Sequence, residues 1–320
     1  MNIRASEFPF LPKDFIQTKE GLIFAVVSYH DHGNKVGCFL RYVPDENGWH
    51  KVKTEQANQL LENEFPQYLF RSQQVDAHYH AVSVDDIVVH HQPEKRLQEV
   101  LTRAAQDEIE RKLHTLIPIL NQFGVSTESL GLTGSMLINQ QKSTSDIDLA
   151  VYGRDAFQKS RLAVRQAIED GVIQKLDLSL MQDNYERRDS ELQFDEFAWH
   201  EERKFNKAAI ESTKFDIGMV CLNNEIEVDH DMYQKLGPRT FKTQIIDDHR
   251  AFDFPANYLV ADEETPEILS FTHTYIGQAQ QGELVEVSGM VERNMTTGQC
   301  RLIVGSSREA EGEYIKVINR

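Results

Sequence analysis

The sequence predicts an α+β fold divided into several domains, and three observations indicate it. Two β-prone runs separated by a turn lie near the N-terminus, at residues 21–29 and 35–43. Apolar residues then recur at helical spacing between residues 94 and 123. From residue 258 onward, short strand-like runs alternate with glycine-containing turns. A chain of 320 residues is long for one average domain and sufficient for two or three.

The composition is that of a globular protein and restricts its partners. The formal net charge is −17, which argues against broad, non-specific binding to polyanions. No run of about twenty apolar residues is present, and residues 1–10 lack the apolar core of a signal peptide, so we expect no membrane partner. The cysteines Cys38, Cys221 and Cys300 are far apart, which favours a reducing, cytoplasmic setting over a disulfide framework or a zinc site.

Residues 1–93 predict an N-terminal α/β module. Residues 30–34 supply turn chemistry between the two strand-like runs, so we expect a β-hairpin. Thr54 is expected to cap a helix that continues to Leu61. Histidines fall in this region without a compact set of other ligands, at His50, His78, His80, His90 and His91. We therefore expect exposed histidines here rather than a transition-metal site.

Residues 94–225 predict a second domain, which opens with one long helix after Pro93. The apolar positions at helical spacing are Leu97, Val100, Leu101, Ala104, Ile109, Leu113, Leu116, Ile117 and Leu120. Pro118 is expected to kink this helix or to split off its last turn, and Gly124 is expected to end it. The helix is expected to pack on the core.

The stretch from Leu130 to Tyr152 carries the strongest chemical signal. Asp148 heads a β-prone run, so this piece predicts a strand. Side chains two apart on a strand lie on the same face, which places Asp146 and Asp148 together. Two such carboxylates repel each other unless a cation lies between them, and Mg²⁺ prefers carboxylate and phosphate oxygens.

The turn Thr133-Gly134-Ser135 precedes these aspartates by about ten residues. Gly134 has no Cβ, so its backbone can come close to a bulky anion. Ser135 adds a hydroxyl group, and a helix beginning at Ser135 would direct its free N–H groups toward the same anion. One element is therefore expected to hold phosphate and the next to hold the metal.

This pattern resembles the signature of the DNA polymerase beta-like nucleotidyltransferase superfamily. The residues that carry the resemblance are Gly134-Ser135 and Asp146-Ile147-Asp148-Leu149. The layout of the whole chain looks like that of stand-alone predicted nucleotidyltransferases of archaea and bacteria. The resemblance implies a nucleotidyltransferase core with a mixed sheet. It also implies transfer of a nucleoside monophosphate from a nucleoside triphosphate to a hydroxyl acceptor, with release of pyrophosphate.

The resemblance further implies two Mg²⁺ ions, or Mn²⁺ in their place, held by Asp146, Asp148 and a third carboxylate from a neighbouring strand. Asp216 is our candidate, because it begins a short apolar strand as Asp148 does. It would complete the metal site and help to deprotonate the acceptor. Asp177 is the rival, although it stands where a helix cap is expected.

Basic and aromatic residues interleave between residues 187 and 207. The candidate nucleotide-binding residues in this stretch are Arg187, Arg188, Lys204 and Lys207, in addition to Gly134 and Ser135. The alternative interpretation is an exposed helix with ion pairs at i,i+4 spacing.

The remaining sequence predicts a polar, irregular connector at 226–257 and a β-rich domain at 258–320. The latter predicts a small antiparallel barrel or sandwich, either of the oligonucleotide-binding type or one used for packing and homodimer formation. The acceptor, whether an RNA 3′ end, a small molecule or a protein, is not fixed by these patterns. The alternative function is a catalytically silent nucleotide- or RNA-binding regulatory module on the same fold.

Overall fold

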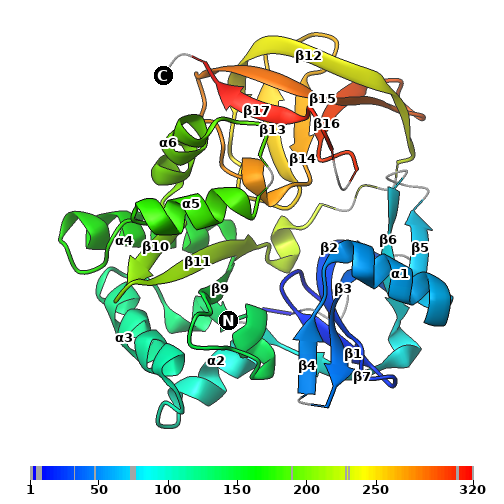
Figure 1. Ribbon diagram of the computed structural model, residues 1–320. Coiled ribbons are helices and arrows are strands. Elements are labelled where there is room, and N and C mark those ends of the chain that lie inside the picture. Colours follow the sequence, from blue (N-terminus) through cyan, green and yellow to red (C-terminus); the bar gives the residue numbers. More distant parts are fainter. Residues whose placement is uncertain are drawn as a thin grey trace. The chain divides into compact units, whose positions relative to one another are not determined.

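The computed structural model describes residues 3–4, 9–31, 33–46, 48–72, 77–188, 190–227, 229, 231–307 and 310–318. The described chain is mixed α+β, with three sheets and the α-helices α1 to α6 (Figure 1). It divides into two compact units. Unit 1 comprises residues 1–72, 78–173 and 209–229, and unit 2 comprises residues 73–77, 174–208 and 230–320. Within the described ranges, no helix is both long and apolar enough to span a bilayer.

The first part of unit 1 is a seven-stranded sheet with the order β5-β6-β3-β2-β1-β7, in which β4 also pairs with β3. Its strands are β1 (Phe15–Thr18), β2 (Ile23–Asp31), β3 (Lys35–Asp45), β4 (Gly48–Lys51), β5 (Leu69–Ser72), β6 (Ala77–Ser83) and β7 (Ile87–His91). Strands β2 and β3 are antiparallel, which confirms the predicted hairpin. Helix α1 (Thr54–Glu64) packs Ala57 and Leu61 on this sheet, but its N-cap is Lys53 rather than Thr54.

The long helix expected after Pro93 is two helices, α2 (Pro93–Leu101) and α3 (Glu108–Gln122). The break has a local cause, since the Asp107 side chain accepts a hydrogen bond of 2.9 Å from the backbone N–H of Glu110 and caps α3. Pro118 lies inside α3 as predicted. Seven of the nine predicted apolar positions are buried, which confirms the expected packing role, whereas Leu101 is half-buried and Ala104 is exposed between the two helices.

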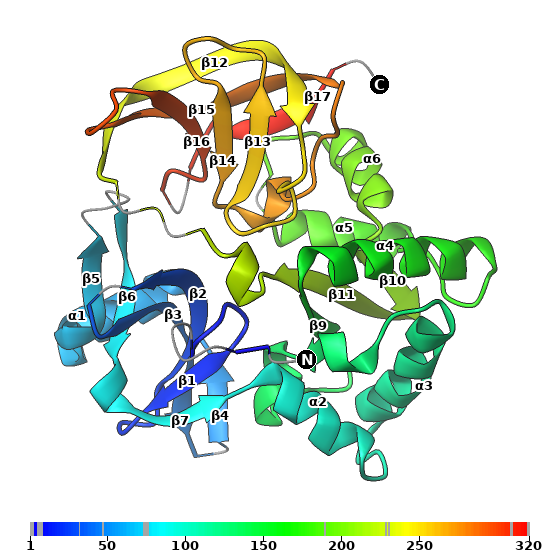
Figure 2. The same cartoon turned by 180° about the vertical axis from the view of Figure 1, so that it is seen from behind.

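The second sheet of unit 1 has the strand order β10-β11-β9-β8. Its strands are β8 (Leu130–Leu132), β9 (Ile147–Tyr152), β10 (Lys207–Ile210) and β11 (Thr213–Val220). Strand β9 pairs antiparallel with β8 and parallel with β11. Helix α4 (Arg154–Glu169) packs against both β9 and β11 (Figure 2). Gly153, with φ 96°, is the N-cap of α4, and Asp155 lies within its first turn.

Unit 2 contains α5 (Leu178–Glu186), α6 (Phe194–Lys204) and a six-stranded sheet. The strands are β12 (Tyr233–Asp247), β13 (Ala256–Val260), β14 (Glu267–Ser270), β15 (Leu284–Asn294), β16 (Cys300–Val304) and β17 (Tyr314–Val317). The order is β12-β13-β14-β16-β15-β17, and β12 also pairs with β15. Five strands therefore form a closed ring of pairings, in which only β14 and β16 are parallel among the described pairs.

One prediction for this region is wrong. Residues 226–257 were expected to be irregular, but they contain β12, a 15-residue strand. Its residues alternate between half-buried and exposed along most of its length. Because few of its side chains are fully buried and many are polar, the sequence lacks the apolar alternation that predicts a strand. Strand β14 ends at Ser270, and a 3₁₀ turn, η6 (His273–Tyr275), follows. The Thr272 side chain accepts a hydrogen bond from Thr274 N–H and caps that turn.

Candidate functional site

Three carboxylates meet on one face of the small sheet of unit 1. Asp148 of β9 and Asp216 of β11 are direct register partners in the parallel pairing. Asp146 lies two residues before Asp148, just ahead of β9. The Asp146 and Asp216 side chains are each 22 % exposed. The structure thus brings together the three aspartates selected from the sequence, whereas the rival Asp177 caps α5 by accepting a hydrogen bond of 2.8 Å from Leu180 N–H.

A lysine that the sequence analysis did not select lies among these carboxylates. The Nζ of Lys214 is 2.9 Å from Oδ2 of Asp146 and 3.7 Å from Oδ2 of Asp216, and its side chain is only 5 % exposed. Burial disfavours its charge, but Asp216 and Asp146 outweigh this effect and raise the pKa of Lys214 above its ordinary value. The sequence signal was the spacing of Lys214 and Asp216, which places both on one face of β11.

The ionised form of Asp148 is disfavoured by its surroundings in the cluster. Burial raises its pKa above the ordinary value, and the negative charges of Asp216 and Asp146 act in the same direction, while Lys13 and Lys214 oppose them. A second sign of incomplete compensation is Oδ1 of Asp216, which is buried without a hydrogen-bond partner in the described chain. The cluster therefore favours additional positive charge.

The predicted glycine turn lies directly against Asp148. Gly134 has φ 65°, and a Cβ at this position would collide with Oδ2 of Asp148. Ser135 does not begin an α-helix as expected, because residues Gly134–Ile138 form a short 3₁₀ helix, η4. The Ser135 hydroxyl is 3.4 Å from that of Ser145, in the loop that leads to Asp146. The turn and the carboxylates thus form one local structure.

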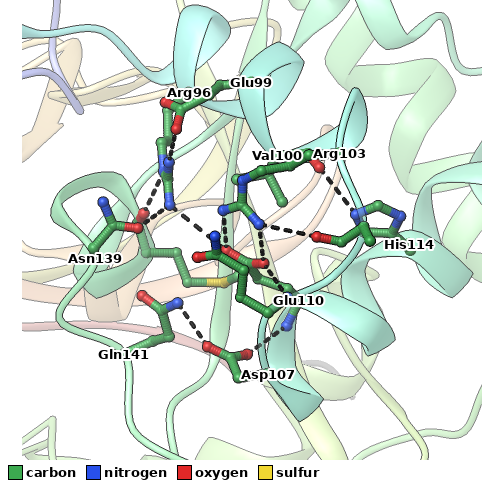
Figure 3. Close-up of polar contacts among 12 residues, drawn as sticks. Arg96, Glu99, Val100, Arg103, Asp107, Glu110, His114, Asn139 and Gln141 are labelled. Carbon is green, nitrogen blue, oxygen red and sulfur yellow. Dashed lines mark hydrogen bonds and ion pairs between the residues drawn. The ribbon is translucent and has the colours of Figure 1, made fainter.

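A buried ionic network anchors the far end of η4 (Figure 3). Arg96 of α2, 6 % exposed, donates from Nε to the carbonyl of Met136 at 3.0 Å and from Nη2 to Oδ1 of Asn139. Fully buried Glu110 accepts two hydrogen bonds of 2.6 Å from Arg103 and lies 3.6 Å from Arg96. Helices α2 and α3 thereby fix the segment that connects Gly134 with Asp146.

A second contact holds the same connecting loop. Nε2 of Gln141 donates a hydrogen bond to Oδ2 of Asp107 at 2.9 Å (Figure 3). Asp107 therefore both caps α3 and binds the connecting loop. Asn139, at the end of η4, has the left-handed φ of 56°, which Asn tolerates better than most residues. None of these supporting residues was selected from the sequence, because their pairing depends on the tertiary packing of α2 and α3.

Two of the four basic residues predicted to bind nucleotide have internal partners in unit 2. Lys204, 1 % exposed, donates to Oε1 of Glu201 at 2.6 Å and to the carbonyl of Thr274 at 2.8 Å. Lys207, 8 % exposed, pairs with the same glutamate. Burial lowers the pKa of Lys204 to about 8. Burial alone would raise the pKa of Glu201, but the charges of Lys204 and Lys207 outweigh this effect and hold that pKa far below its ordinary value. These two lysines therefore have partners within unit 2, and their role in nucleotide binding stays a prediction.

The other two basic residues follow α5. Arg187 forms an i,i+4 ion pair of 2.8 Å with Asp183 and is 57 % exposed, as the alternative interpretation of a charged helix surface expected. Arg188 is half-buried, and its charge contributes to the lowered pKa of Lys204. Neither contact points to a ligand.

The carboxylate cluster can be tested as a metal site from its own chemistry. Three carboxylates, one with a buried oxygen that lacks a partner, suit a hard divalent cation. In the described ranges, however, no three His, Cys, Asp or Glu side chains are already arranged so as to hold a metal ion. The ammonium group of Lys214 neutralises two of the three carboxylates instead. The donor set fits a divalent cation, and binding would require Lys214 to share these oxygens.

Comparison with known proteins identifies one relative over nearly the whole chain. "Uncharacterized protein MJ1086" of Methanocaldococcus jannaschii is 34 % identical over 333 aligned positions, which cover 95 % of this chain and 98 % of that protein. No protein-family model matches the chain. No solved structure matches it either.

Proposed function

The chain belongs to the family of the Methanocaldococcus jannaschii protein MJ1086, and we propose that it is a metal-dependent nucleotidyltransferase. It would move a nucleoside monophosphate from a nucleoside triphosphate to a hydroxyl acceptor and release pyrophosphate. The observation that carries the proposal is the register pairing of Asp148 with Asp216, directly beside the Gly134 turn. A phosphate-compatible turn and a carboxylate cluster therefore meet in one place.

Asp146, Asp148 and Asp216 would hold Mg²⁺, or Mn²⁺ in its place, since carboxylate oxygens are the preferred ligands of such hard cations. When bound, the metal would neutralise phosphate charge and align the attacking and leaving oxygens. The added positive charge would also relieve the repulsion that raises the pKa of Asp148. Lys214 would keep the remaining carboxylate charge balanced.

In the proposed reaction, the acceptor oxygen forms a bond to the α-phosphorus. The bond from the α-phosphorus to the oxygen that bridges to the β-phosphate breaks, and pyrophosphate leaves with that electron pair. The proton of the acceptor hydroxyl passes to Asp216, whose Oδ1 has no hydrogen-bond partner in the described chain. The Gly134 turn and the Ser135 hydroxyl would hold the triphosphate, so most of the catalytic effect would come from positioning and charge.

The strand ring of unit 2 supports RNA as the acceptor. Numbered from β12, its five strands pair in the order 1-2-3-5-4-1, with the third and fifth parallel and the first and fourth antiparallel. This order resembles the oligonucleotide-binding barrel, which binds single strands on its surface. On that basis we propose that the C-terminal region is a barrel of this type.

A catalytically silent binding module is the second candidate function. The observation in its favour is Lys214, because an internal cation already pairs with Asp146 and Asp216. Such a protein would bind nucleotide or RNA without releasing pyrophosphate.

Label transfer distinguishes the two functions. The purified full-length chain would receive each α-labelled nucleoside triphosphate with Mg²⁺ or Mn²⁺, with and without total cellular RNA. Asp148→Asn should abolish transfer, whereas Asp177→Asn should retain it, because Asn also caps helices. Full activity in Asp148→Asn would refute the proposed site. Nucleotide binding without transfer in any condition would support the silent module.

A further inference from the structure

Lys13, in the N-terminal module, has a backbone conformation that a lysine rarely adopts. Its φ is 80°, in the region that favours glycine. Its N–H donates to the carbonyl of Val26 at 3.2 Å, and its own carbonyl accepts a hydrogen bond of 2.7 Å from Oγ1 of Thr133. Thr133 immediately precedes Gly134, so the strained residue is attached to the glycine turn of the proposed site. Strained backbone of this kind is concentrated at functional sites.

The side chain of Lys13 lies over the same face of the small sheet as the carboxylates. A Cβ added to Gly218 would lie 3.0 Å from both Cε and Nζ of Lys13, so this lysine lies in close contact with β11 at Gly218. Gly218 is two residues beyond Asp216 and pairs with Ala150, which is two residues beyond Asp148. Two small residues thus leave room for a lysine next to two aspartates. The charge of Lys13 also favours the ionised form of Asp148.

Lys13 and Lys214 differ in the exposure of their side chains and in their partners. Lys214 is 5 % exposed and its ammonium group lies between Asp146 and Asp216. Lys13 is half-buried, and its main chain is fixed to the residue before Gly134. The hydrogen bond from Thr133 holds the backbone of Lys13 beside the glycine turn, so the ammonium group and the turn can contact one ligand together.

We propose that Lys13 binds the triphosphate of the nucleotide, so that the N-terminal module completes the binding site. An ammonium group with three donors on a flexible stem suits phosphate oxygens. This inference rests on the proposed function for the identity of the ligand. It assigns a role to residues 1–93, which the sequence analysis treated as a separate module.

The first test is binding of inorganic tripolyphosphate and of each ribonucleoside triphosphate, in Mg²⁺, to the full-length chain by calorimetry. Lys13→Met should weaken binding of both probes at least tenfold, and Lys13→Arg should restore part of it. Gly218→Ala keeps the charge but displaces the ammonium group, so it should also weaken binding. Lys19→Met is the matched control, because Lys19 belongs to the same module and is 68 % exposed, and it should bind as wild type.

Kinetics separates phosphate binding from a role that acts only through Asp148. Lys13→Met should raise KM for the nucleotide at least tenfold while kcat changes less than threefold. Tripolyphosphate binding that is unchanged in folded Lys13→Met, or a fall in kcat alone, would overturn the inference. Wild-type protein that does not bind tripolyphosphate would overturn it as well. Lys13-dependent binding without any transfer would leave this inference standing and refute the nucleotidyltransferase.

Discussion

Asp148 and Asp216 are direct neighbours across the parallel pairing of β9 and β11, and each carries its carboxylate to the same face of the sheet. This pairing concentrates negative charge where the Gly134 turn leaves no room for a side chain. The consequences for stability can be measured separately from activity.

Replacing Asp148 with Asn should stabilise the protein at neutral pH in the absence of metal. The pKa of Asp148 is raised above its ordinary value of 3.8 by burial and by Asp216. Its contribution to stability is therefore fully present below about pH 3.8 and is lost as the pH rises through the raised value. Asp148→Asn removes this loss, so it should raise the free energy of unfolding at neutral pH. Melting curves in EDTA should show a higher Tm at pH 7.5 and a shrinking difference toward pH 4. A lower Tm at pH 7.5 would contradict this.

Gly134→Ala should destabilise unit 1 and abolish nucleotide transfer. The new Cβ would meet Oδ2 of Asp148, and φ of 65° is also unfavourable for Ala. Gly171→Ala is the matched control, because Gly171 has φ 71° and open space around its Cβ position. Both variants should lose about 1 kcal/mol for the backbone, and Gly134→Ala should lose about 1–3 kcal/mol more for the collision. Urea unfolding measures the difference, and equal losses would show that the collision is relieved.

Lys214→Met should destabilise the protein, and divalent metal should restore the loss. The substitution leaves Asp146 and Asp216 without their shared cation, which costs about 2 kcal/mol for carboxylates that are partly exposed. Millimolar Mg²⁺ or Mn²⁺ should raise the Tm of the variant more than that of wild type. Lys112→Met serves as the control, since Lys112 bonds the carbonyl of Glu211 and the hydroxyl of Thr213, and metal should not rescue it. Absence of rescue in Lys214→Met would argue against a cation site.

Asn139→Gly should weaken nucleotide binding with a small effect on stability. Glycine keeps the left-handed backbone but removes the acceptor of the Arg96 hydrogen bond, which fixes the end of η4. Asn139→Ala should cost about 1 kcal/mol more, because Ala is strained at this φ. Asn34→Gly is the control, since Asn34 has φ 61° and an exposed side-chain contact. A KM for nucleotide that stays the same in Asn139→Gly would show that η4 does not need this anchor.

Local patterns predicted the features that depend on neighbouring residues. The hairpin of β2 and β3, the cap at Asp177 and the strand through Asp216 follow from turn chemistry, capping and apolar runs. The two helices in place of one were also readable, since Asp107 followed by Glu110 three residues later is a typical helix start.

The sequence could not predict which distant charges would pair. Lys204 and Lys207 looked like surface cations, but burial against Glu201 is decided by the packing of unit 2. Lys13 reaches Asp148 through a contact from the N-terminal module that no local pattern encodes. Lys214 is different, because its spacing of two residues from Asp216 on one strand was a local signal. Strand β12 was missed because its outward-facing polar residues diluted the apolar signal.

The chain enters unit 2 for residues 174–208 after β9 and returns to unit 1 with residues 209–229, which include β11. During synthesis, Asp146 and Asp148 therefore leave the ribosome well before their partner Asp216. A nascent chain that stops before β11 holds Asp148 without its register partner Asp216, on a strand whose described pairing is then with β8 alone. No single truncation can yield unit 1 with all three aspartates and without the inserted helices. A minimal fragment that carries Asp146, Asp148 and Asp216 has to be made by replacing residues 174–206 with a linker, which keeps β10 intact.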